Sequence, residues 1–275
     1  MIDLLKTDLK RAVKDKLFIV LSIIAVAFAF VTPLLYKFIF ALMEVDAETM
    51  QELDAILGTI NAKAMFFGAF SLGNNFGLIL PLFVAIIICK DFSNGTIRNK
   101  IICGKSRASI YFSLLITCAI LICFFILAHA ILTLLISLIF FNYQQTEFTA
   151  SDFGYLMASI GLEFIIYLLV SAILTFFITS MKNMGLSIVC YFALSFLMII
   201  IGSVTQTAVM FVDVDTVAFK ILEFFNVSNP FMGGAIGTGV SYDIKTILYI
   251  ILPNVIISAV VIVLGLLIFK KRDLK

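Results

Sequence analysis

The chain has 275 residues, of which 63% are hydrophobic and 13% charged, and its formal net charge is +2. Soluble domains average about 45 to 50% apolar and about 25% charged residues, so this composition excludes a water-soluble fold. A single histidine and five cysteines without metal-ligand spacing leave almost no material for a zinc site or a histidine-based catalytic triad. The near-balanced charge gives no sign of a nucleic-acid partner, and we expect none.

At the amino terminus, residues 2–16 place apolar side chains at positions 2, 5, 9, 12 and 13. This spacing predicts an amphipathic helix that lies in the inner membrane interface. The alternative is a solvated tail that only sets the orientation of the chain. The apolar run that follows is longer than the core of a signal peptide and has no small-residue cleavage site, so we expect an uncleaved first span.

Six long apolar stretches predict membrane-spanning helices, because a helix needs roughly 20 apolar residues to cross a hydrocarbon core of about 30 Å. Helices are expected rather than barrel strands, since the backbone must satisfy its own hydrogen bonds in lipid. The predicted fold is an all-α integral membrane protein that forms a single domain over residues 1–275. The predicted spans are 17–40, 66–89, 110–141, 154–180, 186–210 and 246–269.

Most of the 19 lysines and arginines fall in segments that would share one side of the membrane with the amino terminus. Short loops rich in these residues stay in the cytoplasm, so both termini are predicted to be cytoplasmic. We expect a multi-pass protein of the cell membrane, and we expect that membrane to be a bacterial cytoplasmic one.

The longest predicted cytoplasmic loop, residues 90–109, is polar, basic and rich in turn-forming residues. A short helix is predicted within it, from about Thr96 to Cys103. One side of this helix would carry Ile97, Ile101 and Ile102, and the other side would turn three polar residues to water, Arg98, Asn99 and Lys100. An apolar stripe on a cytoplasmic helix predicts a partner surface; the alternative is a simple charged connector.

The last predicted outer segment, residues 213–245, contains an apolar patch from Val217 to Phe225. This patch is too short to cross the bilayer. We expect it to dip back into the membrane before the sixth span or to cap the spans from outside.

A chain that hydrolysed ATP would need a phosphate-binding loop of the form G-x-x-x-x-G-K-[ST]. The nearest match runs from Asn99 to Ser106 and lacks the first glycine. The motifs of metal-dependent and serine hydrolases are absent as well. We therefore expect no enzymatic activity in this chain and no cofactor bound to it.

Polar residues inside the predicted spans are costly in lipid and usually face protein or water. His129 and Glu163 flank the outer loop between spans three and four at similar distances, which predicts a shared hydrogen bond or ion pair. A proton-relay role is the alternative. Asn74 and Asn75 lie among glycines in the second span, a pattern that suits either a subunit interface or a polar substrate path.

The layout and one local motif resemble the permease subunits of ABC-2 type transporters. The layout is an amphipathic amino-terminal helix, six spans, a basic loop after span two, a re-entrant-looking segment before span six and a basic tail. The motif begins at Asp91, passes through Gly95 and Thr96 and an apolar stretch, and ends at Ser106 and Arg107. It is similar to the family pattern of an acidic residue, Gly-Thr, an apolar stretch and then Ser-Arg before the third span.

The resemblance implies that residues 91–107 form a coupling helix seated in a groove of a separate ATPase, and that residues 2–16 form an interfacial elbow helix. It assigns ATPase coupling to Asp91, Gly95, Thr96, Ile97, Arg98, Ile101, Ile102 and Arg107. Two permeases, identical or paralogous, would bind two cytoplasmic ATPase subunits that hold ATP and Mg.

The activity implied by the resemblance is ATP-driven transport, most simply export, by alternating access between paired permeases. The main alternative is a channel or a secondary transporter driven by an ion gradient, which predicts more intramembrane carboxylates than Glu163 and an internal repeat. A structural or sensory membrane protein is a third alternative. Nothing in the residues selects a substrate.

Overall fold

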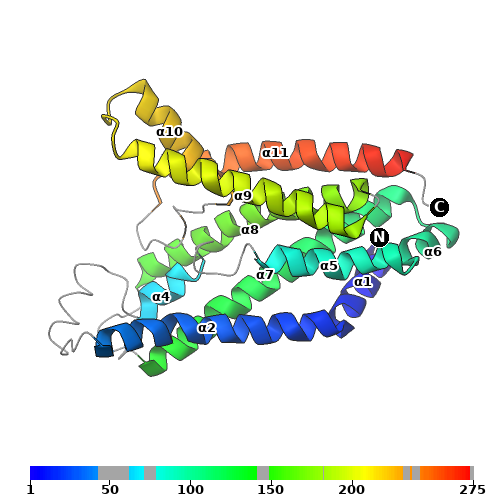
Figure 1. The fold of residues 1–275 in the computed structure, drawn as a ribbon, viewed down its shortest axis with the longest axis horizontal. Coiled ribbons are helices and arrows are strands. Elements are labelled where there is room, and N and C mark those ends of the chain that lie inside the picture. Colours follow the sequence, from blue (N-terminus) through cyan, green and yellow to red (C-terminus); the bar gives the residue numbers. More distant parts are fainter. Residues whose placement is uncertain are drawn as a thin grey trace.

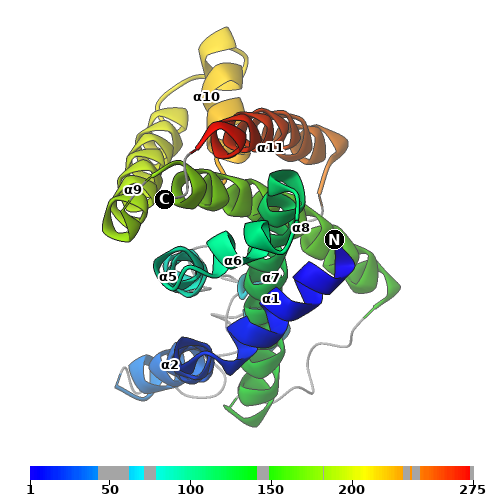
Figure 2. The ribbon, with the colours of Figure 1, turned by 90° about the vertical axis from the view of Figure 1, so that its right-hand side faces the viewer.

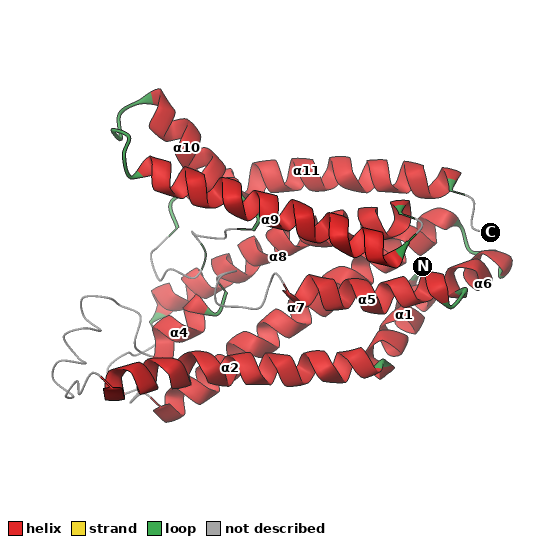
Figure 3. Ribbon diagram, viewed as in Figure 1, coloured by secondary structure: helices red, strands yellow, loops and turns green. Residues whose placement is uncertain are grey.

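A computed structural model describes residues 1–42, 62–70, 79–140, 149–181, 183–231, 236 and 242–272. Every regular element in these ranges is an α-helix (Figure 3). The helices are α1 (Ile2–Lys14), α2 (Lys16–Leu42), α4 (Ala62–Gly68), α5 (Ile79–Ser93), α6 (Thr96–Ile102), α7 (Arg107–Phe140), α8 (Ala150–Ser180), α9 (Met184–Val209), α10 (Val217–Ser228) and α11 (Ile244–Lys271).

Five of these helices, α2, α7, α8, α9 and α11, are long and apolar enough to cross a membrane. A sixth span results only if α5 and α6, which bend by 54° at their junction, are counted together. The prediction of an all-helical, multi-pass membrane protein is therefore confirmed for the described residues. The predicted second span, 66–89, meets α4 at one end and α5 at the other, and residues 71–78 between them lie outside the described residues.

The bundle has its polar groups inside and many of its apolar groups outside. α11 packs chiefly on α8, and α2 packs chiefly on α7, while α7 and α8 also contact each other. Hydroxyls such as Ser113, Ser171 and Thr175 are buried between these helices. By contrast, apolar side chains such as Ile23 and Ile256 are about 60% exposed. Such a distribution suits a lipid solvent, because hydrocarbon accepts apolar side chains and not polar ones.

The start of α1 and the end of α11 lie at the same end of the bundle (Figure 1). We call this end, which also holds the α5–α6 turn and the start of α7, the proximal end; α4 and α10 lie towards the opposite, distal end. Figure 2 looks along the bundle from the proximal side and shows α1 lying across α7, with which it is in contact. The segments predicted to share the cytoplasm therefore gather in one place.

The apolar patch predicted before the sixth span is part of α10, a helix of 12 residues. At about 1.5 Å per residue it is too short to cross a bilayer. It packs on α9 and α11, and it is anchored where Asn254 Nδ2 donates to the Ser228 carbonyl at 3.1 Å and Asn229 Nδ2 donates to the Met198 carbonyl at 2.7 Å.

Candidate functional site

The short helix α6 projects at the proximal end, bracketed by two glycines with left-handed backbone. Gly95, with φ of 70°, ends α5 and starts α6. Gly104, with φ of 79°, ends α6: its N–H donates to the Ile101 carbonyl, and the next N–H, of Lys105, donates to the Lys100 carbonyl. This pair of bonds is a Schellman motif, which glycine favours because it has no Cβ to clash. The two glycines thus define both ends of α6.

α6 buries a different face from the one predicted. Ile97 is 2% exposed and Lys100 is 8% exposed, whereas Ile102 is 72% exposed and projects with Arg98 and Asn99. The expectation that Lys100 faces water is therefore wrong. The reason is helical spacing: a residue three positions after Ile97 lies on the same face as Ile97, and Ile102 lies away from it. Most of the isoleucine stripe is thus covered by this chain, and Ile102 alone remains at the surface.

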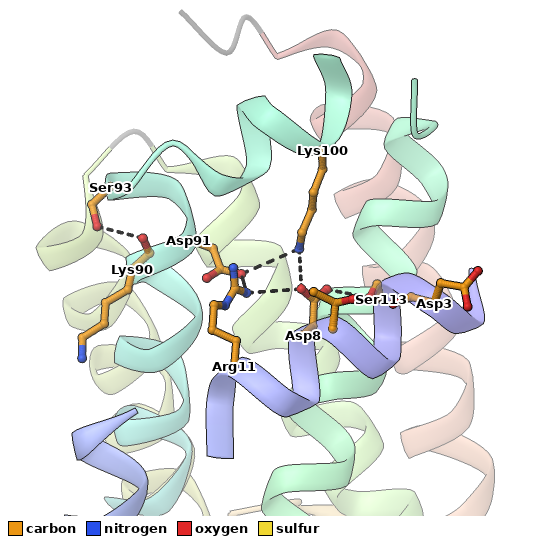
Figure 4. Close-up of polar contacts among 9 residues, drawn as sticks. Asp3, Asp8, Arg11, Lys90, Asp91, Ser93, Lys100 and Ser113 are labelled. Atoms are coloured by element: carbon orange, nitrogen blue, oxygen red, sulfur yellow. Dashed lines mark hydrogen bonds and ion pairs between the residues drawn. The ribbon is translucent and has the colours of Figure 1, made fainter. Parts of the chain in front are cut away.

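Lys100 can be buried because it joins a charge cluster that we define as Asp8, Arg11, Asp91 and Lys100 (Figure 4). Lys100 Nζ lies 2.6 Å from Asp8 Oδ1 and 3.8 Å from Asp91 Oδ2. Arg11 Nη2 lies 3.2 Å from Asp8 Oδ1 and also contacts Asp91 Oδ2. Asp8 and Asp91 are 1% and 3% exposed. Buried charges persist only when they are paired, and this cluster pairs α1 with both α5 and α6.

Ser113 of α7 extends the charge cluster into the bundle. Its Oγ donates to Asp8 Oδ2 at 2.7 Å, so both oxygens of Asp8 are engaged. A carboxylate held from three sides is well compensated for its burial. The charge cluster therefore links α1, α5, α6 and α7.

α1 turns a polar residue inward, which corrects its predicted amphipathic face. The buried positions are Leu4, Asp8 and Ala12. Ile2 and Val13, which were expected on the apolar face, are 78% and 50% exposed. The contacts of Asp8 with Lys100 and Ser113 supply the physical reason, because they rotate α1 so that Asp8 faces the bundle.

A second ion pair joins the junction of α1 and α2 to α5. Lys90 Nζ lies 2.7 Å and 2.8 Å from the two carboxylate oxygens of Asp15. Burial alone would raise the pKa of Asp15, but the hydrogen bonds from Lys90 and from the Leu17 N–H outweigh it and hold that pKa below its ordinary value. The carboxylate is therefore ionised at neutral pH and available to Lys90.

The basic residues around the chain's last helix cap helix ends. Arg107 Nη1 donates to the carbonyls of Phe269, Lys270 and Arg272 at 2.5 to 3.2 Å. Arg272 Nη1 donates to the Thr179 carbonyl at 2.6 Å. Carbonyls at helix C-termini lack partners of their own and carry partial negative charge, so cations stabilise them. Arg107 thus faces the end of α11 in this structure, rather than the exposed side of α6.

His129 and Glu163 are both buried, at 1% and 5% exposure, in α7 and α8. No hydrogen bond or ion pair joins these two side chains, both of which the structure describes, so their predicted contact is not present. Similar distances from the loop along the sequence thus did not bring the two side chains into contact. Asn74 and Asn75 lie outside the described residues.

Reasoning from sequence missed the charge cluster except for Asp91. Asp8 and Arg11 were not singled out, and Lys100 was expected to face water. The signal that could have found Asp8 is its spacing, since it lies four residues from both Leu4 and Ala12. Within the described residues, no group of three or more histidine, cysteine or acidic side chains is arranged to hold a metal ion.

Comparisons with known proteins give one match. Searches of curated proteins and of solved structures found nothing similar. One family model matches residues 17–275 and is described as a protein of unknown function, DUF2705. That match begins at the start of α2 and covers every long helix of the bundle. The chain belongs to the DUF2705 family.

Proposed function

We propose that this chain is the transmembrane permease subunit of an ATP-driven ABC transporter. The observation that carries the proposal is the geometry of α6, a short exposed helix that is fixed at both ends and tied into the bundle behind it. α6 presents Arg98, Asn99 and Ile102 outward, at the end that also holds the start of α1 and the end of α11. The sequence has no complete phosphate-binding loop, so the ATP and Mg would reside in a partner ATPase that grips this helix.

The charge cluster makes α6 suitable for transmitting motion. Removing one partner of a buried ion pair costs about 3 to 5 kcal/mol, so such pairs resist separation. Lys100 and Asp91 connect α6 and α5 to α1, and Ser113 extends the connection to α7. A displacement of α6 by an ATPase would therefore move four helices together, as rigid-body switching requires.

The complete assembly that we propose contains two permeases and two cytoplasmic ATPase subunits. The permeases cross a bacterial cytoplasmic membrane with both termini inside, α1 serves as the elbow helix, and α10 serves as the re-entrant segment. ATP binding would close the ATPase pair and open the path between the permeases towards the outside, which corresponds to export. The Asp91 to Arg107 motif and the gathering of basic segments at the proximal end support this arrangement.

Charged substitutions on the exposed face of α6 test the proposal. Ile102→Asp and Arg98→Glu should each weaken ATPase binding by about thirtyfold, and so reduce ATPase retention and ATP hydrolysis in purified complexes, because a desolvated contact at the centre of an interface is worth about 2 kcal/mol. The ATPase is identified by photolabelling with an azido-ATP analogue. Val214→Asp, at a side chain that is 67% exposed outside α6, is the matched control and should change neither. Full retention of the ATPase by both α6 variants, or the absence of any ATP-binding subunit, would contradict the proposal.

One observation favours the alternative of an ion-gradient-driven transporter. Glu163 is buried in α8, and its Oε2 has no hydrogen-bond partner in the part of the chain that the structure describes. Buried acids of this kind carry protons in some transporters. Reconstituted vesicles with a pH gradient and no ATP decide between the two: transport under these conditions favours the alternative, and transport that needs ATP and the partner favours the ABC assignment.

A further inference from the structure

A cavity of about 230 Å³ lies at the proximal end between α1, α5 and α7. It borders the charge cluster but not the exposed face of α6, so it is separate from the proposed ATPase contact. Its mouth is near Lys14 and Asn94, which are exposed, and its inner part reaches Thr117, which is 2% exposed. Its volume is large enough for a small oxyanion with a few waters.

The acidic side chains of the cavity are already neutralised by cations of the same chain. Asp15 is paired with Lys90, and Asp8 and Asp91 contact Arg11 and Lys100. Together with Lys14, four cations therefore face these three carboxylates in and beside the cavity. The excess positive charge argues against a metal cation as the occupant and favours an anion.

The hydrogen-bonding groups that remain in the cavity can donate. Arg11 uses only Nη2 in its contacts with described residues, which leaves Nε and Nη1. Lys14 forms no ion pair with any residue that the structure describes. Arginine and lysine side chains donate hydrogen bonds and have no acceptor atom. An occupant with several acceptor oxygens would satisfy them.

The buried hydroxyl of Thr117 is a second observation, independent of the charges, that points to a ligand in this cavity. Its Oγ1 is buried and has no hydrogen-bond partner among the described residues, although a threonine in a helix can bond the backbone one turn earlier. A buried hydroxyl without a partner costs about 1 to 3 kcal/mol. It lines the same cavity as Arg11 and Lys14. The hydroxyl is therefore placed to donate to an acceptor inside the cavity.

We propose that this cavity binds a phosphate group, held by Arg11, Lys14 and the Thr117 hydroxyl, with Asn94 at the mouth. Phosphate oxygens accept several hydrogen bonds at once and match an arginine beside a lysine. Such a group has two physical sources. One is the headgroup of a membrane phospholipid, which lies at the level where helices emerge from the bilayer, and the other is a free phosphate from solution. The site is independent of the transporter assignment, since it uses neither α6's exposed face nor a partner.

Unfolding of the full-length protein in detergent tests the site. The unfolding midpoint is measured with inorganic phosphate against potassium chloride of equal ionic strength. It is then measured with phosphatidylglycerol against a diacyl glycolipid of the same chains and no phosphate. A ligand that binds only the folded protein raises the midpoint with its concentration. A rise with the phospholipid alone identifies a lipid headgroup, and a rise with inorganic phosphate as well identifies a free phosphate; either supports the site.

Two variant pairs locate the binding. Thr117→Val removes the hydroxyl without removing a bond to any described residue, so this variant should fold, and Thr133→Val is the matched control. Thr133 also lies in α7, is also 2% exposed and also has an Oγ1 without a described partner, but it does not line the cavity. Lys14→Gln is paired with Lys10→Gln, an exposed lysine of the same helix outside the cavity.

Thr117→Val and Lys14→Gln should each weaken the apparent affinity for the phosphate ligand about tenfold or more, because a hydrogen bond to a charged group contributes on that scale. Their control variants should bind like the unmodified protein. The proposal is overturned if neither phosphate probe raises the midpoint of the unmodified protein. It is equally overturned if Thr117→Val keeps the full effect, or if Thr133→Val loses as much.

Discussion

Lys100 is the residue whose environment departs furthest from its expected one. It lies in a basic, polar loop, and the sequence of that loop alone predicts that its side chain faces water. In the folded chain its ammonium group is buried between Asp8 and Asp91, from two different helices. A lysine gives up its hydration only where carboxylates replace it. The burial of Lys100 therefore depends on α1, which is far away in the sequence.

Asp8→Asn should destabilise the protein by about 3 kcal/mol, because it leaves buried Lys100 with a single, more distant carboxylate. Unfolding in detergent by increasing denaturant measures the change. Asp3→Asn, at an exposed position of the same helix, should have little effect. The double variant Asp8→Asn with Lys100→Met should recover part of the loss. The single variants are Asp8→Asn and Lys100→Met. If the double variant loses as much stability as the two single variants lose together, the two charges are not coupled.

Glu163→Gln should change the stability by less than about 1 kcal/mol. Glu163 is 5% exposed, and its Oε2 has no hydrogen-bond partner among the described residues, so an ionised side chain would carry the cost of an uncompensated charge. Glutamine keeps the volume and remains neutral. Glu163→Ala should cost about 2 kcal/mol or more, because it leaves a cavity. Denaturant unfolding compares the two, and a large loss with glutamine would indicate an ionised, paired carboxylate instead.

At this scale the sequence identifies which residues are unusual but not which residues meet. His129 and Glu163 were correctly singled out as polar groups within apolar helices, and both are buried. The predicted contact between them is absent, because whether they meet depends on how α7 and α8 slide and rotate against each other. Whether Asp8 and Lys100 meet likewise depends on packing, since contact between α1 and α6 is decided over 92 positions of separation.

α6 shows how far local signals define an element. Turn-forming residues before Gly95 and helix-forming residues after it predicted a helix over about 96–103, and the structure has Thr96–Ile102. Which face of the helix is buried was harder to predict. Seven residues make only two turns, and several rotations of such a helix about its axis would bury two isoleucines. Tertiary pairing of Lys100 selects among these rotations. Local chemistry thus defined the ends of α6, and long-range charge defined its face.

Replacing two glycines that both have room for a Cβ should change the stability of the protein in opposite directions. At Gly104 an added Cβ meets nothing within 4 Å, but φ is 79°, so Gly104→Ala should cost about 1 to 2 kcal/mol in backbone strain. Gly154 lies inside α8 and is equally open. Gly154→Ala should therefore stabilise by about 0.5 to 1 kcal/mol through helix propensity. Denaturant unfolding measures both. Equal effects of the same sign would show that α6 does not end as described.

For the whole molecule, hydropathy was sufficient to predict an all-helical, multi-pass membrane protein. Five of the six predicted spans correspond to single long helices. The predicted second span, 66–89, stays a prediction as a single helix, because residues 71–78 lie outside the described part of the chain. The order in which helices pack was not predictable. Lipid offers no hydrophobic force to arrange them, so small residues, hydroxyls and ion pairs decide their contacts.

The last prediction concerns the orientation of the whole molecule in the membrane, and it can be tested with a native cysteine. Cys103 follows α6 and is exposed, whereas Cys89 and Cys118 are buried and Cys123 and Cys190 lie within helices of the bundle. A membrane-impermeant maleimide should therefore label Cys103 and leave the other four largely unmodified. If the proximal end is cytoplasmic, labelling occurs in inside-out vesicles and not in right-side-out vesicles.

The Cys103→Ser variant supplies the background for a control from the other side. Adding Val214→Cys places a thiol on an exposed residue in the connection between α9 and α10. This site should show the reverse pattern, with labelling only in right-side-out vesicles. Labelling of Cys103 from outside would show that the molecule has the opposite orientation in the membrane. α6 would then lie outside the cell, where no cytoplasmic ATPase reaches it. The direction of labelling therefore tests the membrane topology and, through it, the physical basis of the proposed coupling.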